Sequence, residues 1–185
     1  MRLFTIMASV IGFAAAGVVQ AANPVVVMET SKGTIKIELF EDKSPVTVKN
    51  FLTYVDDKHY DGTIFHRVKD TFMIQGGGFD AQGKEKKTRD SIKNEASNGL
   101  SNKKGTIAMA RTNDPDSATA QFFINTVDNP FLDKNERSAG YCVFGKVIEG
   151  MDVVDKIKSV KTAGGALSDW QPIDAIVIKS VRRAK

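Results

Sequence analysis

The stretch from Phe65 to Phe79 is FHRVKDTFMIQGGGF, and it combines three features that rarely occur together. Large apolar side chains stand at both ends and in the middle. One cation, Arg67, lies within a run of residues that favour β-strands. Three glycines follow Gln75, and glycine allows a positive φ or the close approach of another backbone. The pattern predicts two neighbouring strands, Ile64–Val68 and Met73–Gln75.

Strand alternation predicts which of these side chains share a face. Because successive side chains of a strand point to opposite faces, Phe65 and Arg67 are expected on one face and His66 on the other. Met73 and Gln75 share a face in the second strand. If the two strands pair, Arg67, Met73 and Gln75 line one apolar patch with a cation and an amide, which is typical of ligand sites. The alternative is a solvated edge arginine beside ordinary core side chains.

The composition is that of a single globular domain. The chain has 185 residues, of which 42% are hydrophobic and 26% charged, and its formal net charge is +4. It is therefore long enough to bury one core. Lysines and acids are interleaved, and the short basic clusters predict solvated faces and not a nucleic-acid site. The two histidines and one cysteine form no metal-ligand motif. Cys142 lies in an apolar run, so we expect a buried, unreactive thiol.

Residues 1–21 have the organisation of a cleavable secretory signal peptide. A positive charge precedes the apolar, small-residue-rich run Leu3–Val19, and Val19-Gln20-Ala21 matches the small-x-small cleavage pattern. Cleavage after Ala21 is therefore expected, and the alternatives are cleavage after Ala22 or a retained membrane anchor. The mature domain would then be residues 22–185, without membrane attachment and, by default, a monomer.

Hydrophobic periodicity predicts a mainly β domain with two helices. Strands are expected at residues 25–29, 34–40, 64–68, 73–75, 106–111, 121–124, 142–147 and 173–181. One helix is expected to start at Pro45, with Ser44 as its N-cap, and a second at Gly150. The polar segment Gly83–Leu100 is predicted to be a long loop. The strands favour a closed antiparallel sheet, but periodicity leaves open whether it is a barrel or a sandwich.

Four further motifs follow the opening stretch along the chain. They are GTIAMAR at 105–111, QFFIN at 121–125, FLD at 131–133 and YCVFGKVIEGMDVVDKI at 141–157. Together with FHRVKDTFMIQGGGF, they resemble the cyclophilins, a family of peptidyl-prolyl cis-trans isomerases, and among these the bacterial periplasmic members. The resemblance covers about Val25 to the C-terminus. It implies a closed eight-stranded antiparallel β-barrel capped by two α-helices, isomerase activity, and a periplasmic role in folding exported proteins.

The resemblance also implies the site residues. Arg67 matches the catalytic arginine of the family, and Gln75 matches the amide that contacts the substrate backbone. Matching substrate-binding positions are Phe72, Met73, Ala110, Arg111, Gln121, Phe123, Phe131, Leu132 and Tyr141. Phe131 stands where many eukaryotic members carry Trp, Tyr141 where they carry His, and Arg111 replaces a common Asn. Because an indole donor is missing at the pocket rim, we expect weak cyclosporin binding. Trp170 is expected to lie outside the pocket.

The chemistry of proline isomerisation suits a groove of this kind. Rotation about a peptide bond has a barrier of roughly 18–20 kcal/mol because the nitrogen lone pair is delocalised. In the twisted transition state the lone pair returns to nitrogen, which can then accept a hydrogen bond. A donor that meets only this state lowers the barrier with no nucleophile, metal or cofactor. The permanently charged guanidinium of Arg67 suits that role, whereas His66 is expected to be structural.

Two rival functions stay open at the level of sequence. One is a binding module that holds proline-containing segments of unfolded or exported polypeptides in the same groove, with incidental turnover. The other is a phosphate or nucleotide site built on Gly76–Gly78. No Gly-Lys-Ser/Thr sequence follows these glycines and no helix is predicted there, so this alternative is the weaker one.

Overall fold

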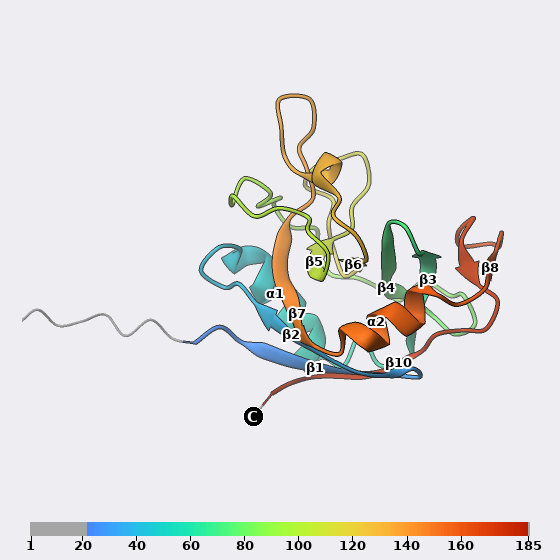
Figure 1. The fold of residues 1–185 in the computed structure, drawn as a ribbon. Coiled ribbons are helices and arrows are strands. Elements are labelled where there is room, and N and C mark those ends of the chain that lie inside the picture. Colours follow the sequence, from blue (N-terminus) through green and yellow to red (C-terminus); the bar gives the residue numbers. More distant parts are fainter. Residues whose placement is uncertain (1–21, 185) are drawn as a thin grey trace, which may run out of the picture.

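The computed structural model describes residues 22–184, and its main feature is one antiparallel sheet of eight strands (Figure 1). In sheet order these are β10 (Ile178–Arg183), β1 (Val25–Thr30), β2 (Gly33–Leu39), β7 (Val143–Glu149), β5 (Thr106–Met109), β6 (Phe122–Asn125), β4 (Met73–Asp80) and β3 (Thr63–Lys69). The sheet closes where β3 meets the residues just before β10, because Ile64 bridges Val177 and the Phe65 amide donates to the Ile176 carbonyl at 3.0 Å. The sheet is thus a nearly closed barrel, as predicted.

Two α-helices and three small elements complete the fold. The helices are α1 (Pro45–Asp56) and α2 (Met151–Lys158), and the small elements are the 3-10 turn η1 (Pro130–Leu132) and the paired strands β8 (Thr162–Ala163) and β9 (Gln171–Pro172). Each α-helix packs an apolar face on the barrel core; these side chains are Val48, Phe51, Leu52, Val55, Val153, Val154 and Ile157. Within residues 22–184, no helix has the length and apolar character needed to cross a membrane. The predicted signal peptide lies outside the described residues.

The start of α1 is stabilised differently from the prediction. Ser44 occupies the N-cap position, but its hydroxyl makes no capping bond and donates instead to the Val143 carbonyl at 3.0 Å. The Glu95 carboxylate caps the helix in place of Ser44. It accepts hydrogen bonds from the Thr47 amide at 2.8 Å and the Thr47 hydroxyl at 2.7 Å. A negative charge is favourable at a helix N-terminus. The segment 83–100, which forms the predicted long loop, therefore holds α1 in place.

The three successive glycines lie inside β4 and serve close packing within the barrel. A Cβ atom at Gly76 would lie 2.8 Å from the Ile64 carbonyl oxygen. Gly77 has a φ of +87°, and a Cβ there would lie 2.9 Å from the Phe122 ring. Since the run is neither a loop nor the start of a helix, its local structure gives no support to a nucleotide site.

The last barrel strand begins later than predicted. Ile176 and Ile178 are buried, in agreement with the predicted alternation, but β10 starts only at Ile178, and Ile173 is 64% exposed. The reason lies in the partner strand, since β1 ends at Thr30, which pairs with Ile178. Residues before Ile178 therefore have no partner in β1, and Val177 bridges to β3 instead.

Candidate active site

A groove of about 170 Å³ opens beside β3, β4 and β6. Its lining side chains come from separate parts of the chain and are Arg67, Phe72, Met73, Gln75, Ala110, Arg111, Phe123, Leu132 and Tyr141. Met73, Phe123 and Leu132 are buried in a small apolar cluster beside the main core. The tertiary structure therefore brings together all of the predicted site residues except Gln121 and Phe131, which contact lining residues from outside the groove.

Gln121 and Phe131 each extend the groove through one neighbour. Gln75 donates a hydrogen bond from Nε2 to Gln121 Oε1 at 3.0 Å, so Gln121 orients the amide of Gln75. Phe131 is 64% exposed and stacks on Phe72, with 5.6 Å between the ring centroids. Phe131 thus continues the apolar wall of the groove outward into solvent.

A β-bulge in β3 places Arg67 in the groove. Phe65 pairs with Gly76 and Arg67 pairs with Gln75, so two steps along β3 oppose one step along β4. Phe65 points into the main core, whereas Arg67 lines the groove. The prediction that Phe65 and Arg67 share a face is wrong, because the bulge interrupts the alternation. The prediction that Arg67, Met73 and Gln75 line one patch is confirmed.

The Arg67 guanidinium lies against two aromatic rings. Its central carbon is 5.7 Å from the centroid of Phe72 and 5.2 Å from that of Trp170, both within the range of cation–π attraction. Its Nη1 atom donates to Gln75 Oε1 at 3.5 Å. Trp170 does not line the groove, as predicted, yet its ring contacts Arg67, one of the two cations that do. Sequence reasoning missed this contact because no local pattern links Trp170 to a residue so distant in the chain.

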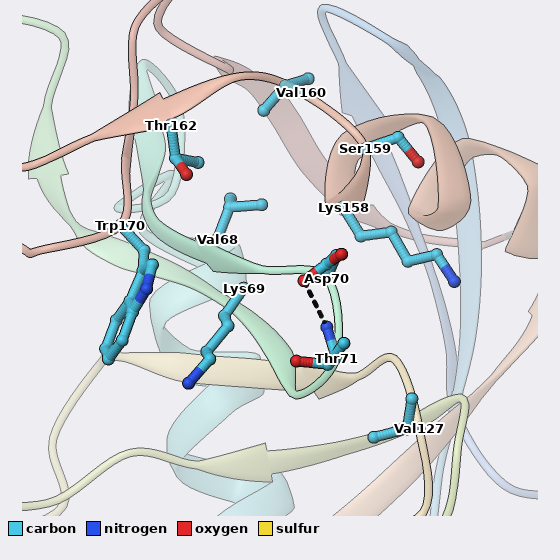
Figure 2. Close-up of a pocket in the computed structure, with 10 residues that line it drawn as sticks. All are labelled: Val68, Lys69, Asp70, Thr71, Val127, Lys158, Ser159, Val160, Thr162 and Trp170. Carbon is cyan, nitrogen blue, oxygen red and sulfur yellow. Dashed lines mark hydrogen bonds between the residues drawn. The ribbon is translucent and has the colours of Figure 1, made fainter.

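Trp170 also lines a second and larger hollow, of about 640 Å³, beside the end of α2 (Figure 2). The Lys69 amine lies 4.3 Å from the centroid of the Trp170 ring, and the two side chains lie next to each other in Figure 2. Lys158 is paired with Asp155 at 3.0 Å, and the Asp70 carboxylate also faces this hollow. Charges of both signs are mixed here. Trp170 thus contacts one cation of each hollow, Arg67 in the groove and Lys69 in the larger one.

Two titratable side chains near the groove do not line it. His66 is buried and packs against Phe79, with 4.8 Å between the ring centroids. Burial, together with the charge of Arg67, lowers the pKa of His66 to about 4, so this imidazole is neutral at pH 7. Burial raises the pKa of the Cys142 thiol. Their positions agree with structural roles for both residues and not with an acid, base or nucleophile.

Residues 25–183 match the family model described as cyclophilin type peptidyl-prolyl cis-trans isomerase/CLD. The chain belongs to the cyclophilin family. A peptidyl-prolyl cis-trans isomerase of Acinetobacter baylyi is 56% identical, over 89% of this chain and 90% of the relative. Peptidyl-prolyl cis-trans isomerase B of Escherichia coli is 55% identical, over 84% of this chain and 97% of its own length. This cyclophilin is therefore a peptidyl-prolyl cis-trans isomerase with bacterial relatives.

Solved cyclophilin structures share the fold. A crystal structure of a cyclophilin type isomerase from Cryptosporidium parvum superposes with a TM-score of 0.73 at 28% identity, covering 88% of this chain and 98% of that one. A crystal structure of that protein in the presence of the dipeptide Ala-Pro also gives a TM-score of 0.73, covering 87% and 99%. The predictions of a mainly β cyclophilin barrel and of isomerase activity are confirmed.

Proposed function

We propose that this cyclophilin rotates X-Pro bonds in the groove around Arg67, with the proline ring held in its apolar part. That part consists of Phe72, Met73, Phe123 and Leu132. Met73, Phe123 and Leu132 are buried before any peptide binds, so the shape of the pocket is preformed. The observation that carries the proposal is the position of Arg67, a permanent cation at the edge of this pocket.

In this mechanism Arg67 donates a hydrogen bond to the prolyl nitrogen of the twisted amide. The nitrogen of a planar X-Pro amide has no free lone pair. The hydrogen bond from Arg67 therefore forms chiefly in the transition state, and it lowers the barrier to rotation. A thousandfold acceleration requires about 4 kcal/mol. One hydrogen bond to a charged group contributes roughly 1.5–3 kcal/mol, and exclusion of water from the apolar pocket adds to it.

Gln75 would hold the substrate backbone beside the rotating bond. Its Oε1 atom accepts from Arg67, and its Nε2 atom donates to Gln121 at 3.0 Å. The three side chains therefore form a chain of polar contacts along one wall. Such a chain restricts the rotamers of Arg67 and Gln75, which reduces the entropy lost when a peptide binds. Ala110 leaves room for the peptide backbone to pass this wall.

We further propose that the mature enzyme acts on exported polypeptides as they fold. Support comes from the signal-like composition of residues 1–21. Uncatalysed X-Pro exchange takes tens to hundreds of seconds, so it limits the folding of many chains. N-terminal sequencing of the protein from the periplasm of an expressing bacterium should begin at Ala22. A chain that begins at Met1 and fractionates with the cytoplasm would exclude this location.

The catalytic proposal is tested by measuring cis-to-trans conversion of a short X-Pro peptide. Residues 22–185 should accelerate conversion, and Arg67→Ala should bring the rate close to background while largely preserving peptide affinity measured by calorimetry. Arg137→Ala removes an exposed arginine outside the groove and serves as the control. If Arg67→Ala turns over peptide as fast as the parent chain, the proposed role of Arg67 is wrong.

A binding module that holds proline-containing segments is the alternative, and it uses the same groove. The two roles can be distinguished in a bacterial strain that lacks this protein and grows poorly without it. If Arg67→Ala restores growth of that strain as well as the parent chain does, the physiological role is binding and not turnover. If Arg67→Ala still binds peptide but fails to restore growth, the isomerase role is supported.

A further inference from the structure

Two of the groove-lining side chains are cations that form no salt bridge within residues 22–184. These are Arg67 and Arg111. Away from the groove, by contrast, Arg89, Arg182 and Arg183 are each paired with an aspartate. No Asp or Glu side chain of the described chain lines the groove. The groove therefore presents two uncompensated positive charges to a bound peptide.

Arg111 is fixed in the groove wall and is not a loose surface side chain. Its Nε atom donates to the Gly140 carbonyl at 3.0 Å, and its Nη1 atom donates to the Thr112 carbonyl at 2.8 Å. Its guanidinium carbon lies 4.5 Å from the centroid of the Tyr141 ring. Tyr141 also lines the groove. Because a guanidinium carries five N–H donors, Arg111 still has donors for a ligand.

The carboxylates nearest to Arg111 and Leu132 in the sequence are already engaged elsewhere. Asp133 accepts hydrogen bonds from the amide and side chain of Asn102. Asp116 accepts from the Asn94 amide at 2.8 Å, and Asp114 accepts from the Asp116 amide at 3.0 Å. All three hold loops together and none pairs with Arg111. These carboxylates therefore provide no ion-pair partner for the groove cations within residues 22–184.

We propose that Arg111 makes this cyclophilin select proline segments that carry an acidic side chain within two residues of the proline. The inference rests on the proposed binding of peptide in the Arg67 groove and adds a substrate class to it. A carboxylate of the substrate would accept hydrogen bonds from the unused donors of Arg111, in the planar geometry that suits a guanidinium. A lysine at the same place would be repelled by Arg111 and Arg67.

The test compares peptides that differ only in one residue near proline. Glu, Gln or Lys is placed in turn at the two positions on each side of proline, and kcat/KM is measured by NMR exchange, which needs no coupling protease. At low salt we expect kcat/KM at the responsive position to be about three- to tenfold higher for Glu than for Lys. The ratio should fall as ionic strength rises, because the groove is open to solvent.

Arg111→Gln should remove most of the Glu preference and leave only the smaller effect of the Arg67 charge. Arg137→Gln is the matched control, because it removes the same charge from an exposed site outside the groove and should leave the ratio unchanged. Arg111→Lys keeps the charge, so it should keep most of the Glu preference even if hydrogen bonds to the two carbonyls weaken. Thermal unfolding of each variant verifies that it is folded.

Equal kcat/KM for Glu and Lys peptides at all four positions would overturn the inference. So would an equal loss of the ratio in Arg111→Gln and Arg137→Gln, since that would reflect net charge alone. These outcomes leave the proposed function intact as long as Arg67→Ala loses turnover of a neutral peptide. If Arg67→Ala is fully active, the proposed catalytic role of Arg67 is wrong, whatever the Glu-to-Lys ratio shows.

Discussion

Trp170 holds the guanidinium of Arg67 from outside the groove. The guanidinium carbon lies 5.2 Å from the centroid of the indole ring, and the Trp170 carbonyl accepts a hydrogen bond from the Val68 amide at 2.8 Å. This backbone hydrogen bond holds Trp170 beside β3, the strand that carries Arg67. The ring therefore restricts the positions that the guanidinium can take, although Trp170 does not line the groove.

Trp170→Ala should lower kcat by about two- to fivefold, corresponding to a cation–π attraction of about 0.5–1 kcal/mol. KM should change little, because Trp170 does not line the groove. Trp170→Phe keeps an aromatic face and should recover most of the loss. Steady-state kinetics on one X-Pro peptide separates the two constants, and a raised KM at unchanged kcat would mean that Trp170 contributes to binding instead.

Glu95→Ala should lower the free energy of unfolding by about 1–2 kcal/mol, as loss of a helix N-terminal cap does. The carboxylate of Glu95 accepts from the Thr47 amide and hydroxyl at the start of α1. Urea denaturation followed by circular dichroism measures the change. Glu136→Ala removes an exposed acid and should have little effect. An unfolding midpoint equal to that of the parent chain would show that α1 does not depend on this loop.

His66 should make the stability depend on pH in acid. Its pKa falls from 6.5 to about 4 on folding, mainly through burial and secondly through the charge of Arg67. Between these values the unfolded chain binds a proton that the folded chain does not, so protonation favours unfolding. The free energy of unfolding therefore has its full value above pH 6.5. It decreases, by at most about 3 kcal/mol from His66, as the pH falls toward 4.

The pH effect is measured as the slope of unfolding free energy between pH 6.5 and 4. The other histidine, His59, also has a lowered pKa through burial, so both residues contribute to the slope of the parent chain. His66→Gln should flatten the slope even if it lowers stability at every pH. An unchanged slope would mean that His66 is not desolvated in the folded protein.

Phe131→Trp should strengthen cyclosporin binding. Phe131 is 64% exposed and stacked on Phe72, so a larger ring fits there and adds an indole donor at the rim of the groove. Calorimetry on the two proteins compares the affinities, with Phe131→Leu as a variant that adds no donor. Equal affinity of Phe131→Trp and the parent chain would indicate that the rim donor does not limit binding.

The sequence by itself determined the family and most of the groove. Periodicity located the barrel strands and both helices, and the ordered motifs identified the cyclophilin family. Motif positions such as Arg67, Met73 and Gln75 were predicted to converge and do so. This succeeded because alternation and helical spacing are local properties, and because a shared motif implies a shared local backbone.

Only the tertiary structure decided the contacts between segments distant in the chain. The bulge between Phe65 and Arg67 depends on pairing with β4, and the late start of β10 depends on where β1 ends. Glu95 reaches α1 and Trp170 reaches Arg67 across loops that carry no periodic pattern. The physical reason is the same in each case: register and long-range contacts follow from which surfaces meet when the barrel closes, and no single segment encodes that.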